Sequence, residues 1–181
     1  MTSPFHGFRI VGSRRLAVAS FLEVERLHLR APDGSAVTRV AVRHPGAVAV
    51  VPVDGDDVLM IEQYRAPVGR LLLEIPAGKL DVPGEPPEPA ARRELEEEIG
   101  QRTDALEHLT TIATTPGFSD EVIHIFATDR LHPVPARPVG VEESAARVVR
   151  MPMDEAVAKA QRGQITDAKT VIGLLLAAVR R

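Results

Sequence analysis

Cysteine and tryptophan are both absent from this sequence of 181 residues, and aromatic side chains are scarce, with five phenylalanines and one tyrosine. Without cysteine there is no disulfide framework, no thiolate metal site and no cysteine nucleophile, so a bound metal would need oxygen or imidazole ligands. The scarcity of aromatic rings leaves few side chains that can stack on a nucleotide base. These absences favour a hard cation over a thiolate-bound metal.

Long apolar runs and an excess of basic charge are missing as well. The longest apolar stretch, residues 171–179, is far shorter than a membrane span, and residues 1–10 contain no apolar segment typical of a secretory signal. The 22 basic and 25 acidic residues give a formal net charge of −3, and no basic run suited to nucleic acid or to an anionic membrane occurs. We therefore expect a cytoplasmic protein without nucleic-acid or membrane partners.

The first third of the chain alternates between apolar and polar residues. This alternation over 21–29 and 37–42, with a turn at 32–34, predicts an antiparallel N-terminal strand pair. Apolar runs at 47–53 and 58–61, separated by a turn, predict a buried hairpin.

Strands and helices are interspersed through the remainder. The apolar pattern predicts further strands at 71–75, 110–115, 122–128 and 146–150. Helical periodicity predicts helices at 90–99, 154–161 and 167–179, the last one capped by Thr166. This order indicates an α/β fold in one domain over 1–181, with a mixed sheet covered by helices on both faces.

The helix at 90–99 carries an unusual acidic face. At about 100° per residue, Glu94, Glu97 and Glu98 fall within one arc beside the apolar stripe. Like charges three and four residues apart repel, so the face needs a counterion. One alternative is a solvated face neutralised by Arg92 and Arg93. The other is an all-oxygen site for Mg²⁺ or Mn²⁺, completed by a backbone carbonyl at the end of the preceding strand.

The residues around this helix resemble the Nudix box, the strand–loop–helix signature of the Nudix hydrolases. The match runs from Gly78 to Glu85, continues after seven residues at Arg93, and ends at Gly100. Two departures occur: six residues instead of five separate Gly78 from Glu85, and Gln101 occupies a position that is usually apolar. The extra residue falls in a proline-rich loop, where an insertion costs little.

The resemblance implies an α/β/α sandwich that hydrolyses a nucleoside diphosphate linked to another moiety, with Mg²⁺ or Mn²⁺ as cofactor. It also implies roles for individual side chains. Glu94, Glu97 and Glu98 would be metal ligands, together with the backbone carbonyl of Ala77. Arg93 would orient the glutamates, and Glu85 would support them or bind metal.

Segments outside the box resemble the ADP-ribose pyrophosphatase branch of this family, over roughly residues 39–150. They are 63–65 (Gln-Tyr-Arg), 73–78 (Leu-Glu-Ile-Pro-Ala-Gly) and 116–121 (Pro-Gly-Phe-Ser-Asp-Glu). The resemblance implies hydrolysis of ADP-ribose to AMP and ribose 5-phosphate, with Arg65 on the diphosphate or terminal ribose. The alternative for Arg65 is a surface salt bridge. Hydrolysis of another nucleotide sugar, a dinucleotide or a damaged nucleotide stays open, as does a non-catalytic nucleotide-binding module.

The general base of this branch commonly lies on a loop far along the chain from the box. The acidic pair in that region is Glu142 and Glu143, in a predicted loop that contains Gly140. We expect Glu143 to be the base because it lies nearer the next strand, and Glu142 is the second choice. The alternative is a pair of solvated loop acids.

Recognition of the nucleoside is expected to involve the N-terminal segment. In this branch the N-terminal strand pair often crosses to a partner subunit, so we expect a homodimer, with 1–43 in dimerisation and 44–181 as the catalytic core. Arg39 occupies the place of a family Arg-Glu pair whose acid is missing here. Phe8, Phe21 and Phe118 are the candidates for stacking on the base, and the alternative for each is a place in the core.

Overall fold

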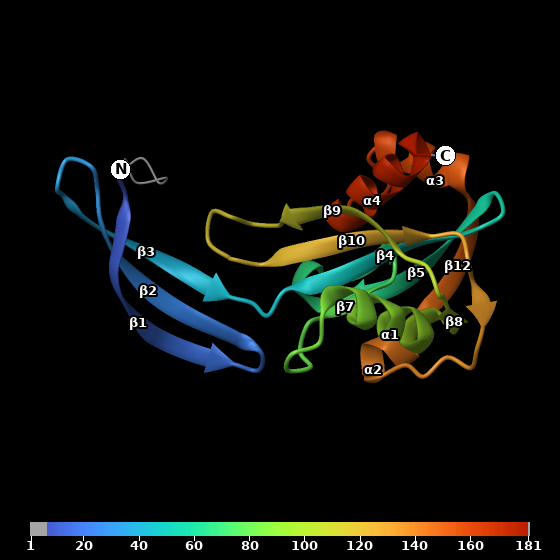
Figure 1. Cartoon of the computed structure of the whole chain (residues 1–181), viewed down its shortest axis with the longest axis horizontal. Helices are drawn as coiled ribbons and strands as arrows, with labels where there is room; N and C mark the ends of the chain where they lie inside the picture. The colour runs from blue at the N-terminus through green and yellow to red at the C-terminus, as the bar shows by residue number, and fades with distance from the viewer. Residues whose placement is uncertain (1–6, 181) are drawn as a thin grey trace. The chain divides into compact units, whose positions relative to one another are not determined.

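The computed structural model describes residues 7–180, which divide into two compact units (Figure 1). Unit 1 comprises the residues up to Gly46 together with Ala113–Val122, and unit 2 comprises Ala47–Ile112 and the residues from Ile123 onward. The first division lies close to the expected one at residue 43. Residues 113–122 lie within the range expected for the catalytic core, and they group with unit 1 in the structure.

Unit 1 is a three-stranded antiparallel sheet of β1 (Arg9–Ala19), β2 (Leu22–Arg30) and β3 (Ala36–Arg43). The expected pair corresponds to β2 and β3, and β1 is an additional strand that the sequence pattern did not predict. The register of β1 against β2 shifts twice, between Ile10 and Gly12 and between Arg15 and Ala17. Such irregularities interrupt the period-2 alternation by which a strand is recognised.

The loop that follows Ala113 is held at the end of β3. The Val42 N–H donates to the Phe118 carbonyl at 2.7 Å, and the Ser119 hydroxyl donates to the Val42 carbonyl at 3.0 Å. Asp120 accepts from the His44 N–H at 3.0 Å and forms an ion pair with Arg43 at 3.0 Å. These bonds explain why the segment groups with unit 1.

Unit 2 is built on a mixed sheet. Its strand order is β12 (Arg147–Pro152), β5 (Asp57–Arg65), β4 (Ala47–Asp54), β10 (Val122–Thr128) and β9 (Glu107–Ala113). Two short strands extend it, because β6 (Arg70–Glu74) pairs with β5 and β7 (Ala77–Lys79) pairs with β4. β10 runs parallel to β4, whereas β5, β7 and β12 pair antiparallel with their neighbours. Small elements complete the unit: the 3₁₀ turn Ala66–Val68, β8 (Gln101–Arg102) and β11 (His132–Pro133).

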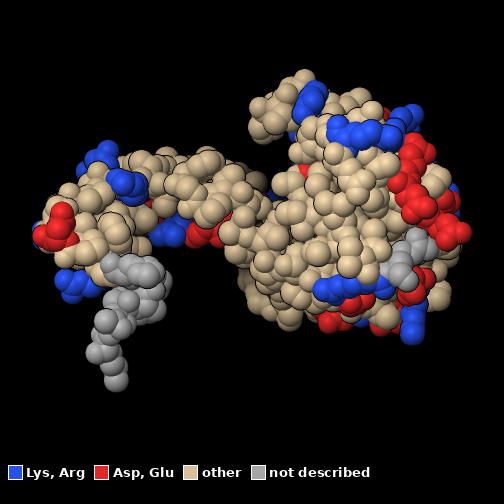
Figure 2. All heavy atoms as spheres, turned by 90° about the horizontal axis from the view of Figure 1, so that it is seen from above, with Lys and Arg blue, Asp and Glu red and all other residues tan. Residues whose placement is uncertain are grey.

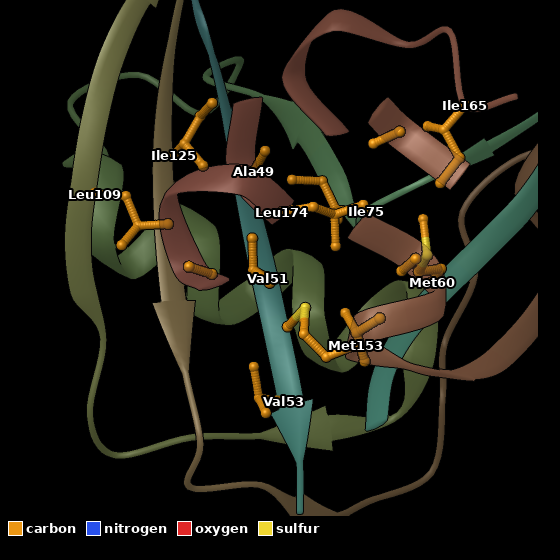
Figure 3. Close-up of a cluster of buried hydrophobic side chains, with 14 of the residues drawn as sticks. Ala49, Val51, Val53, Met60, Ile75, Leu109, Ile125, Met153, Ile165 and Leu174 are labelled. Atoms are coloured by element: carbon orange, nitrogen blue, oxygen red, sulfur yellow. The ribbon is translucent and has the colours of Figure 1, made fainter. Parts of the chain in front are cut away.

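Helices pack on both faces of this sheet, as predicted. One apolar cluster lies between the sheet and helices α3 (Met153–Gln161) and α4 (Ala168–Val179), and Figure 3 shows Val51, Ile75 and Leu174 within it. A second cluster packs helix α1 (Pro87–Ile99) against the opposite face through Leu95 and Ile99. None of the described helices is long and apolar enough to cross a membrane.

Two helix starts differ from the sequence expectation. Helix α1 begins at Pro87, three residues before the predicted start, because prolines lose nothing in a first turn whose N–H groups lack helical partners. Helix α4 is capped by Asp167 and not by Thr166: the Asp167 carboxylate accepts from the Thr170 N–H at 3.0 Å. Thr166 instead accepts a hydrogen bond from Arg70 at 3.0 Å.

Candidate functional site

Strand β7, a proline-rich loop and helix α1 bring the predicted acidic residues of the box together around Arg93. The Arg93 guanidinium lies 2.6 Å from Glu94, 3.2 Å from Glu97 and 3.0 Å from Glu85. One cation thus contacts three carboxylates that repel one another. The orienting role of Arg93 toward a bound metal stays a prediction.

Glu98 points toward strand β7 instead. Its Oε2 accepts a hydrogen bond from the Ala77 N–H at 2.8 Å. Burial raises the pKa of Glu98 to about 8 despite this hydrogen bond, and the negative charges of Glu94 and Glu143 add to the shift. Burial likewise raises the pKa of Glu94 to about 7, although Arg93 acts to lower it. Arg93 therefore does not offset the burial of Glu94, and Arg65 and the Ala77 N–H do not offset the burial of Glu98.

This donor set fits a hard divalent cation. The oxygens of Glu94, Glu97 and Glu98 all come from helix α1, and a cation placed among them would lower the two raised pKa values. Within residues 7–180, no three histidine or acidic side chains converge as a complete metal cage. Glu94 and Glu97 are instead held by Arg93, so metal binding would require them to exchange this partner.

Gly78 leaves the space that the Glu94 carboxylate occupies beside β7. A Cβ atom at this position would lie 1.9 Å from the Glu94 carboxylate carbon. Real Cβ atoms are not found at such distances, so only glycine lets the Glu94 carboxylate lie against the backbone of β7. The first glycine of the box therefore has a steric explanation.

Glu142 and Glu143 lie on a short helix, α2 (Val141–Ser144), and not in the predicted loop. Gly140, with φ of 102°, precedes it, and the Ser144 hydroxyl donates back to the Gly140 carbonyl at 2.6 Å. Glu143 is half-buried and accepts from the Val139 N–H at 2.7 Å, whereas Glu142 is exposed. The Glu143 charge contributes to the raised pKa of both Glu94 and Glu98, so its carboxylate lies near enough to act on the acidic residues of α1.

Arg65 forms a two-pronged ion pair with Glu74. Its Nε and Nη2 atoms donate to the two Glu74 carboxylate oxygens, both at 2.8 Å. Glu74 is fully buried, so this is not the surface salt bridge given as the alternative. The Arg65 side chain remains 41% exposed, and no described residue accepts a hydrogen bond from its Nη1.

Three residues near Arg65 were not identified from the sequence. Glu74 interrupts the apolar run 71–75, and that interruption was the available signal for a buried acid. Lys169 of α4 contacts Glu74, yet nothing in the helical pattern distinguishes this lysine from a solvated one. Gln63, on β5, is 3% exposed, and its side-chain Nε2 has no hydrogen-bond partner among the described residues.

The residues predicted to hold the nucleoside all belong to unit 1. Phe8, Phe21 and Phe118 are 47%, 43% and 57% exposed, so the alternative that they are core residues is wrong. Phe21 packs edge-on against His44, with ring centroids 5.2 Å apart. Arg39 lies on β3 and donates to the Thr38 carbonyl at 2.8 Å. Their contact with substrate stays a prediction.

The structure thus combines a mixed sheet covered by helices with one helix whose carboxylates lie against a glycine-containing strand. This combination defines a class of α/β protein suited to divalent-metal phosphate chemistry. The NUDIX domain model matches residues 43–172. The chain belongs to the Nudix family, whose hydrolases generally need a divalent metal.

Known relatives cover most of the chain. It is 37% identical, over 94% of its length and 83% of the relative's, to an ADP-ribose pyrophosphatase of Mycobacterium tuberculosis. An ADP-ribose pyrophosphatase of Bacillus subtilis is 39% identical and a methanol dehydrogenase activator of Bacillus methanolicus is 40% identical; each match covers 84% of this chain and 82% of the relative. A crystal structure of an ADP compounds hydrolase matches in fold with a TM-score of 0.86 at 23% identity, over 99% of this chain and 96% of that one.

Proposed function

We propose that this protein hydrolyses the diphosphate bond of ADP-ribose, giving AMP and ribose 5-phosphate, with Mg²⁺ or Mn²⁺ as cofactor. The observation that carries the proposal is the acidic face of α1, where Glu94, Glu97 and Glu98 lie together, Glu98 accepts from the backbone of β7, and burial raises the pKa of Glu94 and Glu98. The substrate is inferred from the relatives of Mycobacterium tuberculosis and Bacillus subtilis.

The metal would be held by Glu94, Glu97, Glu98 and the Ala77 carbonyl, with Glu85 in a supporting place. When bound, it neutralises charge on the diphosphate and lowers the pKa of a coordinated water. Without metal, Arg93 holds Glu85, Glu94 and Glu97 through three ion pairs. When metal binds, Glu94 and Glu97 would exchange this partner, and Arg93 would stay paired with Glu85.

Glu143 would act as the general base. A water oxygen attacks one phosphorus, the anhydride P–O bond to the leaving phosphate breaks, and the proton of the water passes to the Glu143 carboxylate. The half-buried position of Glu143 and its electrostatic effect on Glu94 and Glu98 support this choice over the exposed Glu142. Glu142 is the alternative base.

Arg65 would bind the substrate diphosphate. Its Nε and Nη2 are engaged by Glu74, which leaves the Nη1 edge of the fork directed away from that carboxylate. A guanidinium held in this way donates to phosphate oxygens with little further loss of side-chain entropy.

The nucleoside would be held by Arg39 and by stacking on Phe8, Phe21 or Phe118. These residues lie in unit 1, whose sheet we propose to be the interface of a homodimer. Arg39 would then serve the site of the partner subunit.

A substrate panel tests the activity. The full-length protein is incubated with ADP-ribose, another nucleotide sugar, a dinucleotide and an oxidised nucleoside triphosphate, each with Mg²⁺ or with EDTA. We expect AMP and ribose 5-phosphate from ADP-ribose in Mg²⁺ and no products in EDTA. If another substrate is hydrolysed faster, that compound and not ADP-ribose is the preferred substrate. If ADP-ribose binds but no products form, the protein is a binding module and not a hydrolase.

The base is tested by mutation. Glu143→Gln should lower kcat by about 10² to 10⁴-fold with KM nearly unchanged, because proton removal assists only the transition state. Glu142→Gln is the matched control and should have much less effect. The reverse order would make Glu142 the base, and unchanged kcat in both variants would exclude this helix from catalysis.

A further inference from the structure

The first turn of helix α4 connects to the side chain of Arg65 through a buried ionic chain. We propose that Lys169 is a positioning residue that fixes the Arg65 guanidinium for the substrate diphosphate by holding Glu74 between them. This inference rests on the proposed contact of Arg65 with substrate. It adds Lys169, which lies more than a hundred positions after Arg65 in the sequence, as the residue that keeps Arg65 in place.

The ionic chain has three members in direct contact. Glu74 is bound on one side by the Nε and Nη2 of Arg65, both at 2.8 Å. On the other side its Oε2 accepts from the Lys169 ammonium, which is itself only 8% exposed. Oε2 is therefore shared by both cations, so a shift of the Lys169 ammonium would shift the anchor of the arginine fork.

Lys169 is in turn fixed to the start of its helix. Its Nζ lies 3.0 Å from Asp167, the residue that caps α4 by accepting from the N–H and the hydroxyl of Thr170. The Thr170 hydroxyl accepts from the Ile75 N–H at 2.9 Å. The first turn of α4 therefore grips both the Glu74 side chain and the backbone of the next residue.

The charges of the ionic chain and of Asp167 balance, which explains why Glu74 can be buried. Arg65 and Lys169 supply two positive charges, and Glu74 and Asp167 supply two negative ones. Burial acts to raise the pKa of Glu74, but the Arg65 hydrogen bonds and the Lys169 charge outweigh burial, and the net shift is downward. Glu74 thus stays ionised and can act as a fixed anchor.

The members of this ionic chain differ in how exposed their side chains are. Glu74 and Lys169 are buried, whereas the Arg65 side chain is 41% exposed. The charge of Arg65 also acts on the pKa of Glu98, so Arg65 lies near enough to the carboxylates of α1 to interact with them electrostatically. The member of the ionic chain that solvent and substrate can reach is therefore Arg65.

A double-mutant cycle separates positioning from simple stability. Steady-state kinetics with ADP-ribose and Mg²⁺ are measured for Lys169→Met, Arg65→Gln and the double variant. Arg65→Gln should lower kcat/KM by about 10- to 100-fold, as expected for a charge-assisted hydrogen bond. Lys169→Met should lower it by about 5- to 30-fold, mainly through KM, because an arginine that binds the diphosphate throughout the reaction contributes uniform binding.

The decisive value is the effect of Lys169→Met in the Arg65→Gln background. We expect less than about a twofold further loss there, since Lys169 would have no guanidinium left to position. Lys159→Met is the matched control, because Lys159 forms a partly exposed pair with Glu155 on α3 and should leave kcat/KM unchanged. Thermal unfolding of every variant identifies loss of fold, and Lys169→Gln, which keeps a donor for Glu74, replaces Lys169→Met if that variant does not fold.

The outcomes distinguish this inference from the proposed function. If Lys169→Met lowers kcat/KM equally in the wild-type and the Arg65→Gln backgrounds, Lys169 is a structural residue. The inference is then overturned while the role of Arg65 stands. An unchanged kcat/KM in Arg65→Gln overturns both the Arg65 contact and the inference, whereas metal-dependent hydrolysis in the substrate panel would still stand.

Discussion

At the scale of single residues, the site combines side chains that are unfavourable in isolation. Glu94 and Glu98 are four residues apart on one helix and both carry raised pKa values, chiefly because of burial. Gln63 keeps an amide nitrogen out of water without a partner among the described residues. Each of these groups costs folding free energy, so each should leave a measurable trace in the stability of the metal-free protein.

Glu98 should make stability depend on pH. Its pKa is about 8 when folded, against an ordinary value of 4.5, so the folded state holds a proton that the unfolded state releases. In EDTA, the contribution of Glu98 to the free energy of unfolding should therefore be highest below pH 4.5. This contribution should fall as the pH rises from 4.5 to about 8. Glu98→Gln should flatten this decline and be more stable than the wild type at pH 8.

The same variant tests the metal assignment. Glu98→Gln should lose most turnover, and added Mg²⁺ should raise its Tm less than that of the wild type. Urea unfolding in EDTA from pH 5 to 8, together with turnover in Mg²⁺, measures both effects. Near-full activity of Glu98→Gln would disprove the role of Glu98 as a ligand.

Gln63 should be a site where stability can be gained. Gln63→Met keeps a similar volume and removes the unpartnered amide, so it should raise the free energy of unfolding by about 1 kcal/mol. Urea denaturation in EDTA measures this change. Gln164→Met, at an exposed position, should have no comparable effect. Destabilisation by Gln63→Met would show that the amide has a partner, such as a bound water.

At the scale of elements, the place of the Glu94 carboxylate of α1 against β7 depends on the absence of a side chain at Gly78. Gly78→Ala would place a methyl group 1.9 Å from the carboxylate carbon of Glu94 and so displace this carboxylate. We expect a loss of kcat of at least about tenfold and weaker Mg²⁺ binding, since a ligand moved by an ångström no longer fits the coordination sphere. Gly12→Ala is the control for Mg²⁺ binding alone, because Gly12 lies in unit 1 and a Cβ there meets nothing within 4 Å. Normal Mg²⁺ affinity in Gly78→Ala would contradict this account.

Most elements could be predicted from local pattern. The buried strands β4 and β10 and the helix between Pro87 and Gly100 follow from apolar runs and from proline and glycine at the expected ends. Strand β1 was missed because two register shifts break its alternation. Helix α2 was missed because four residues are too few to show a helical period.

The candidate site was only partly predictable, because some of its contacts are local in sequence and others are not. Helical spacing alone places Glu94, Glu97 and Glu98 on one face, and the i,i+4 pair of Arg93 and Glu97 is local too. Glu74 and Lys169, in contrast, are 95 positions apart and meet only through the tertiary fold. No periodicity in one sequence encodes such a pairing, so the anchor of Arg65 was found only in the structure.

At the scale of the whole molecule, the two units differ in how well they bury their apolar side chains. Unit 2 encloses two apolar clusters on opposite faces of its sheet. Unit 1 leaves every residue of β1 exposed, and Ile10, Val11 and Val18 are each 60% exposed. On the face in Figure 2, basic and acidic side chains both occur, separated by broad uncharged areas. A three-stranded sheet with this exposure would be stabilised by a partner.

The partner we expect is a second copy of the chain. β1 pairs only with β2 among the described strands, so its other edge and its apolar side chains remain available for a two-fold interface. Sedimentation at micromolar concentration should give a dimer. Val18→Glu should shift it toward monomer and lower turnover, if Arg39 reaches the site of the partner subunit. Val179→Glu, at an exposed valine of α4, should leave both the dimer and turnover unchanged. A fully active wild-type monomer would contradict both the dimer and the contribution of Arg39 to a partner's site.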